Sequence, residues 1–155
     1  MTGDELRAVM RRFPAPVAVV TADFEGDRIG LTVGSLVSVS LEPTLIAISL
    51  GRAQAAHELI RGARAFAVNL LSWSQEDLAR RFAQGMPPLA LWHGVAARES
   101  AAGPLLEGAL GWLQCRLWGS YDAGDHTLFV GEVLVAEPGV DADGLVYRHG
   151  SYHRV

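Results

Sequence analysis

The most informative segment spans residues 121–133 and reads Tyr121-Asp122-Ala123-Gly124-Asp125-His126-Thr127-Leu128-Phe129-Val130-Gly131-Glu132-Val133. A Gly-Asp-His corner opens onto a run that alternates apolar with small or polar residues, which is the pattern of a β-strand. The corner places one imidazole beside an acidic neighbour at the strand start, where a ligand can reach it. Because the unperturbed pKa of histidine lies nearest physiological pH, such a side chain is a candidate for proton handling or for steering a charged ligand.

Strand patterns dominate the chain on both sides of this corner. Runs rich in β-branched and aliphatic residues occupy positions 17–22, 28–33, 35–40, 44–50, 66–71, 110–121 and 127–136, followed by a terminal hairpin. Amphipathic helices are predicted at 4–13, 54–61 and 75–83, and a flexible excursion at 84–90, which holds one glycine and two prolines. Because the strands follow in up-and-down order, we predict a mainly β fold, an antiparallel barrel with rim helices.

Length and composition indicate one domain that spans residues 1–155. Half of the residues are hydrophobic (50%) and 19% are charged, which is typical of a globular protein. A net charge of −4 without a basic stripe argues against a nucleic-acid partner. No apolar run is long enough to cross a membrane, and the N-terminus lacks the pattern of a signal peptide, so a cytoplasmic location is the expectation.

Metal and disulfide chemistry are not expected. Cys115 is the only cysteine, so no intrachain disulfide can form, and its apolar surroundings predict a buried, inert thiol. His149 and His153 lie four residues apart but across a turn at Gly150, so we predict no metal site. The glycine motif of Rossmann domains and the phosphate loop are absent, so a nucleotide cofactor would be held in another way.

The segment 30–43 combines hydroxyl and glycine residues after a strand, and it reads Gly30-Leu31-Thr32-Val33-Gly34-Ser35-Leu36-Val37-Ser38-Val39-Ser40-Leu41-Glu42-Pro43. Glycine lets backbone amides approach a ligand, and hydroxyls can bond a phosphate or a ring carbonyl. This segment closely resembles a signature of the flavin reductase family, Thr-Val-Ser-Ser followed by Ser-Val-Ser-Leu-Asp-Pro-Pro. The Gly-Asp-His corner resembles another segment of that family.

Further resemblances follow in the order of the family and cover nearly the whole chain. They are the opening segment 13–21, the strand Phe66-Ala67-Val68-Asn69, the helix that carries Leu78-Ala79-Arg80-Arg81-Phe82, and the last hairpin at 145–152. The resemblance rests on the whole ordered series of motifs and not on any one of them. Taken singly, Asn69 is more typical of a structural amide, and Arg80 and Arg81 of a solvated helix face.

The resemblance implies an FMN-binding split β-barrel that forms a homodimer. Such a protein binds FMN or FAD non-covalently, reduces it with NADH or NADPH, and supplies reduced flavin to a partner monooxygenase. By resemblance, Thr32, Val33, Gly34 and Ser35 would line the isoalloxazine and ribityl chain, mostly through backbone groups. His126 would lie near the nicotinamide and help to position it.

The same resemblance places the flavin phosphate at the next loop and helix. The residues expected there are Ser49, Leu50, Gly51, Arg52, Gln54, Ala56 and His57, assisted by the N-terminus of the helix. Phe82, or a neighbour on its helix, would approach the ring or the second subunit, although taken by itself Phe82 is more typical of a core residue. The compact phosphate segment favours FMN over FAD, whereas the sequence does not distinguish NADH from NADPH.

Two departures from the family leave alternatives open. The run Gln54-Ala55-Ala56 lacks the hydroxyls usual in the phosphate segment, and Gly34 stands where many members have serine. Each lost donor would weaken the binding free energy of the flavin by on the order of 1 kcal/mol. A weakly held flavin would then behave as a diffusible substrate instead of a prosthetic group. The alternatives are a flavin-binding electron carrier without NAD(P)H turnover and a binding module that has lost flavin.

Overall fold

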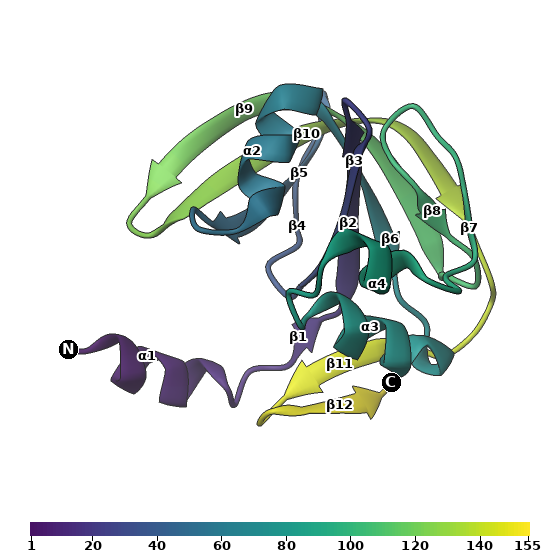
Figure 1. Cartoon of the computed structure of the whole chain (residues 1–155). Coiled ribbons are helices and arrows are strands. Elements are labelled where there is room, and N and C mark those ends of the chain that lie inside the picture. Colours follow the sequence, from purple (N-terminus) through teal and green to yellow (C-terminus); the bar gives the residue numbers. More distant parts are fainter.

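The computed structural model describes residues 1–155, and antiparallel β-strands form most of it (Figure 1). The strands are β1 (Ala15–Pro16), β2 (Ala18–Phe24), β3 (Asp27–Val33), β4 (Val37–Leu41), β5 (Thr44–Gly51), β6 (Ala65–Leu70), β7 (Ala97–Arg98), β8 (Leu105–Leu106), β9 (Gly111–Ala123), β10 (His126–Pro138), β11 (Leu145–Arg148) and β12 (Ser151–Arg154). The helices are α1 (Gly3–Met10), α2 (Ala55–Ala63), α3 (Glu76–Phe82) and α4 (Pro88–Trp92), with a 3-10 turn at Trp73–Gln75.

Seven strands form one curved sheet in the order β3-β2-β6-β9-β10-β5-β4, and all neighbours are antiparallel. Strands β1, β11 and β12 make a separate three-stranded sheet, and β7 pairs with β8. The predicted mainly β, antiparallel class with flanking helices is confirmed. The sheet bends around α2, so its two edge regions approach each other on the concave side (Figure 1).

The long hairpin β9–β10 carries the Gly-Asp-His corner at its tip. Gly124 adopts φ +65°, the left-handed conformation that a tight turn favours. Further along β10, a Cβ added at Gly131 would lie 2.6 Å from Cζ of Phe66, so only glycine fits there. The ladder shifts register beside Gly131, between Val130 and Gly131, which marks an irregularity in β10.

The core lies on the concave side of the sheet. Its largest members, which include Phe66, Phe129, Ile48 and Leu50, are at most 1% exposed. Cys115 belongs to the same cluster, and burial raises the pKa of its thiol to about 12. The predicted buried, inert thiol is therefore confirmed, because only the thiolate is strongly nucleophilic.

Two helical predictions need revision. The first helix ends at Met10 instead of Phe13, and it buries none of its residues although a capping box at Thr2 starts it. The predicted excursion at 84–90 is wrong in its second half, because α4 begins at Pro88 and buries Leu91. Proline is well placed at a helix start, where its missing N–H costs no hydrogen bond. No helix is long and apolar enough to span a membrane.

Candidate functional site

A short seam joins the two edge regions of the large sheet. Ser35, just after β3, donates its hydroxyl to the carbonyl of Ser49 in β5 at 3.1 Å. The backbone N–H of Ser49 donates to Ser35 Oγ at 2.9 Å. This reciprocal pair holds segment 32–35 beside segment 49–51, although the two strands are not neighbours in the sheet order.

A cavity of about 350 Å³ opens at this seam. Its walls are Leu31, Thr32, Val33, Gly34, Ser35, Ser49, Leu50, Gly51, Gln54 and His126. The structure therefore brings together the residues predicted to line the ring and several of those predicted to meet the phosphate. Leu31 was not predicted as a site residue, although it directly precedes Thr32 in strand β3. Arg52, Ala56, His57 and Phe82 do not line this cavity.

His126 reaches the cavity because strand pairing places it there. It is the first residue of β10, and its register partner across the sheet is Gly51 of β5. Its Nδ1 lies 2.7 Å from the carboxylate of Asp125, and its side chain is 49% exposed. The hydrogen bond from His126 is the main cause that lowers the pKa of Asp125. A carboxylate only accepts, so Nδ1 carries the proton in this contact and Nε2 is the nitrogen left for a ligand.

The hydroxyl side chains of the seam are already engaged within the protein. Thr32 Oγ1 donates to the carbonyl of Ala79 in α3 at 2.7 Å, and Ser35 bonds Ser49 as described. These contacts leave the backbone of segment 32–35 as the main polar surface that a ligand would meet. Gly34 suits this role, since a side chain there would begin 3.2 Å from Cβ of Ala15.

The loop after β5 leads into α2 and was predicted to meet a phosphate. Gln54 is the N-cap of α2, and its side chain makes no capping hydrogen bond. The first N–H groups of a helix lack intrahelical partners and carry a partial positive charge, which favours an anion. Ala56, however, is 4% exposed and packs into the core, so its side chain faces the interior.

His57 is also buried, at 4% exposure, and its ring is engaged on both sides. Its Nε2 lies 2.7 Å from Thr127 Oγ1, and its Nδ1 lies 3.0 Å from the carboxylate of Glu58. The Thr127 hydroxyl in turn donates to Asp122 at 3.0 Å. His57 therefore ties the first turn of α2 to the hairpin β9–β10.

Arg52 points toward that hairpin as well. Its guanidinium lies 2.6 Å from Asp122, and its backbone N–H donates to the carbonyl of Asp125 at 3.0 Å. Arg61, from the last turn of α2, lies 3.5 Å from the other oxygen of Asp122. The pKa of Asp122 is lowered, first by the Thr127 hydroxyl and then by Arg52.

Phe82 lies beneath β3. The ring is 1% exposed, and its centroid is 5.0 Å from that of Trp92. A Cβ added at Gly30 would lie 2.3 Å from the ring, so the absence of a side chain at Gly30 gives the ring its space. Phe82 forms part of the wall of a neighbouring cavity of about 370 Å³, together with Gln54, Ala56 and other residues of β3, α2 and α4.

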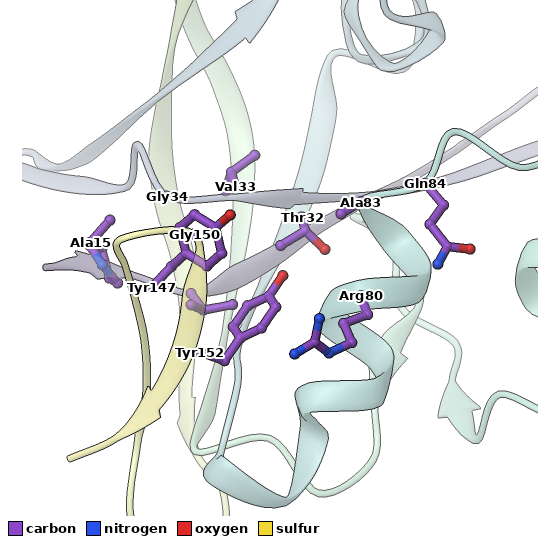
Figure 2. A pocket seen from close by; sticks show the side chains of 12 residues that line it. Ala15, Thr32, Val33, Gly34, Arg80, Ala83, Gln84, Tyr147, Gly150 and Tyr152 are labelled. Atoms are coloured by element: carbon purple, nitrogen blue, oxygen red, sulfur yellow. The ribbon is translucent and has the colours of Figure 1, made fainter. Parts of the chain in front are cut away.

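A further cavity of about 420 Å³ is lined in part by the same segment, Thr32, Val33 and Gly34 (Figure 2). Tyr147 and Tyr152 rise from the C-terminal hairpin toward β3, with ring centroids 5.0 Å apart. Arg80 extends from α3 over the ring of Tyr152, with 5.0 Å between the guanidinium carbon and the ring centroid. Sequence reasoning assigned no site role to the two tyrosines, and it favoured a solvated helix face for Arg80. The sequence signal that could have identified the tyrosines is their position on either side of the turn at Gly150.

Asn69 has the structural role that the sequence favoured. Its amide nitrogen donates to the carbonyl of Val19 at 3.0 Å, and its amide oxygen accepts from the N–H of Leu106 at 2.7 Å. Arg81 donates to the carbonyl of His93 at 2.7 Å, on the outer side of α3.

Known proteins that are similar to this chain are flavin reductases. The family model described as "Flavin reductase like domain" matches residues 10–155. An NADH-dependent FAD reductase from Streptomyces globisporus is 36% identical over 157 residues, which cover 97% of this chain and 84% of the relative.

Two other similar proteins match this chain over almost their full lengths. The reductase component of 4-hydroxyphenylacetate 3-monooxygenase from Thermus thermophilus is 34% identical over 98% of this chain and 96% of its own. The solved structure of flavin reductase PheA2 in its native state superposes with a TM-score of 0.90 at 33% identity, covering 100% of this chain and 99% of that chain.

Proposed function

This chain belongs to the flavin reductase family, and from that membership we propose that FMN or FAD is reduced by NADH or NADPH in the cavity between β3 and β5. Relatives named as NADH-dependent reductases of FAD and FMN support its activity, that of an NAD(P)H:flavin oxidoreductase. The observation that carries the site is the Ser35–Ser49 seam, which gathers the predicted ring-binding residues next to His126.

The residues of the cavity fit a flavin ring system. Leu31, Val33 and Leu50 supply apolar surface, and the backbone of segment 32–35 supplies donors and acceptors for the ring edge. Bound flavin and nicotinamide would supply the hydride chemistry between them. The protein's share is to hold the two rings at a fixed distance and to exclude water.

Each predicted residue of the cavity has a proposed task in that arrangement. Segment 32–35 would bind the isoalloxazine and ribityl chain, and Ser49, Gly51 and Gln54 would border the path toward the phosphate at the start of α2. The free Nε2 of His126 would contact the amide side of the nicotinamide and orient it. None of four further predicted residues lines the cavity at the seam, so we assign no direct flavin contact to Arg52, Ala56, His57 and Phe82.

Reduced flavin made by this chain would pass to a flavin-dependent monooxygenase. Relatives named as reductase components of 4-hydroxyphenylacetate 3-monooxygenase and of a 4-nitrophenol monooxygenase support that role. The absence of hydroxyls in Gln54-Ala55-Ala56 supports a flavin that leaves the site easily, as transfer to a second enzyme requires.

We also propose a split-barrel domain over residues 1–155 that pairs with a second copy. Helix α1 projects from the body, and Leu6, Val9 and Met10 on one side of it are at least 50% exposed (Figure 1). Val9→Glu should shift the protein from dimer to monomer in sedimentation velocity, whereas Ala8→Glu, with the same charge on the opposite side of α1, should not. A wild-type monomer would refute the pairing.

The activity is tested by anaerobic mixing of the purified protein with FMN and NADH. The visible absorbance of oxidised flavin should bleach much faster than in a protein-free control. Binding of flavin without faster bleaching would indicate an electron carrier, and no flavin binding at all would indicate a module that has lost the cofactor. Repeating the experiment with NADPH and with FAD decides the coenzyme and flavin preference.

A further inference from the structure

We propose that Asp122 sets the affinity for flavin by holding Arg52 away from the flavin phosphate. The inference rests on the phosphate position proposed above, at the loop between β5 and α2. It assigns to Asp122, a residue of β9, the role of keeping flavin exchangeable. Asp122 is therefore a residue that determines ligand affinity without contacting the reacting atoms.

The direction of the Arg52 side chain is the first observation. Its neighbours Gly51 and Gln54 line the cavity at the seam, and Ala53 lines the adjoining cavity near Phe82. Arg52 lines neither of them, because its guanidinium lies 2.6 Å from Asp122 on the hairpin side of the loop. Arg52, the cation nearest in sequence to the proposed phosphate position, is thus already paired with a carboxylate.

Asp122 is well fixed as a competitor for that cation. Its Oδ1 accepts from Thr127 at 3.0 Å, and Thr127 is held by buried His57. Asp122 Oδ2 faces Arg52, and Arg61 lies near Oδ1. The Asp122 carboxyl group is ionised at neutral pH even at the ordinary pKa of an aspartate, and the Thr127 hydroxyl and Arg52 lower that pKa further, so the ion pair with Arg52 is present at neutral pH.

The arginines that line the two neighbouring cavities are also paired with carboxylates. Arg28, in the wall of the cavity near Phe82, binds Asp23 at 3.0 Å and Glu99 at 2.8 Å. Arg80, in the wall of the tyrosine-lined cavity, binds Glu76 at 3.3 Å. No unpaired guanidinium therefore lines these cavities, and a phosphate would depend on helix N–H groups unless Arg52 is released.

Releasing Arg52 should strengthen binding only for ligands that carry a phosphate. Asp122→Asn removes the charge yet keeps an amide oxygen that can accept from Thr127, so the hairpin should keep its shape. We expect the FMN dissociation constant to fall roughly fivefold, because a charge-assisted contact is gained at a partly exposed position. Riboflavin, which has the same ring but no phosphate, should bind Asp122→Asn and wild type equally.

A double-mutant cycle tests the role of Arg52 directly. The proteins are wild type, Arg52→Ala, Asp122→Asn and the double variant, each titrated with FMN and with riboflavin. Arg52→Ala should change FMN affinity less than twofold in the wild-type background and should abolish the gain in the Asp122→Asn background. Adding Arg61→Ala to Asp122→Asn is the matched control, and the gain should survive it.

Three results would overturn the inference. They are an unchanged FMN affinity in Asp122→Asn, an equal gain for riboflavin, and a marked loss of FMN affinity in Arg52→Ala alone. The anaerobic reduction of FMN by wild type is measured in parallel. A flat cycle with active wild type refutes only the role of Asp122, whereas a positive cycle with inactive wild type refutes only the reductase activity.

Discussion

The two ends of the proposed flavin site satisfy their polar groups in different ways. At the β3–β5 seam, Ser35 and Thr32 form neutral hydrogen bonds within the protein, to Ser49 and Ala79. At the β5–α2 loop, Arg52 instead forms an ion pair with Asp122, and both side chains are well exposed, at 46% and 59%. Partly buried hydrogen bonds contribute to stability, whereas exposed ion pairs contribute little. Loss of a seam hydrogen bond should therefore lower the stability more than loss of the Arg52–Asp122 ion pair, which should mainly change the affinity for flavin.

The largest effect is expected beneath the seam, at Phe82. Phe82→Ala removes a ring that is 1% exposed and packs against Trp92, so the free energy of unfolding should fall by about 3–5 kcal/mol. Urea denaturation measures this change, and Phe82→Leu should lose clearly less. If Phe82→Ala kept its stability but lost flavin binding, the ring would be a ligand contact instead of a core residue.

The next effect concerns the seam itself. Ser35→Ala leaves the N–H of Ser49 without its acceptor at a partly buried position, which should cost about 1–2 kcal/mol in unfolding free energy. FMN and riboflavin should both bind more weakly, since the seam shapes the ring end. Ser38→Ala, on the exposed strand β4, serves as the control. A loss restricted to FMN would contradict the division between the two ends.

His126 lies between the two ends and should affect catalysis without affecting folding. His126→Ala should lower kcat/KM for NADH about tenfold, equivalent to ~1.4 kcal/mol, while the dissociation constant for flavin stays within twofold. Stopped-flow reduction at varied NADH concentrations separates binding from hydride transfer. An unchanged reductive half-reaction would remove the nicotinamide role from His126.

The smallest effect is expected at the helix cap in the loop. Gln54 makes no capping hydrogen bond, and serine is among the residues preferred at that position. Gln54→Ser should raise the unfolding free energy of the flavin-free protein by about 0.5–1 kcal/mol, whereas Gln54→Ala should not raise it. Thermal unfolding in matched buffers compares the two variants, and equal midpoints would show that the N-cap is satisfied in another way.

Much of the fold was predictable because strand alternation and turn residues are local properties. The hairpin tip at Gly124 and the runs that became β5 and β6 needed only neighbouring residues to be recognised. The helix at Pro88–Trp92 was missed, because its glycine- and proline-rich context resembles a loop and burial of Leu91 is what stabilises it. Such burial depends on residues far along the chain.

The candidate site likewise has features that the sequence predicts and features that only the tertiary structure decides. The sequence by itself determined which segments carry glycine and hydroxyl residues, where the Gly-Asp-His corner lies, and which phosphate-segment hydroxyls are missing. Only the tertiary structure decided that Ser35 bonds Ser49, that His57 faces inward, and that Arg52 pairs with Asp122. The physical reason is that a side chain's partner depends on which strands become neighbours, and pairing across the sheet joins residues that the local pattern does not connect.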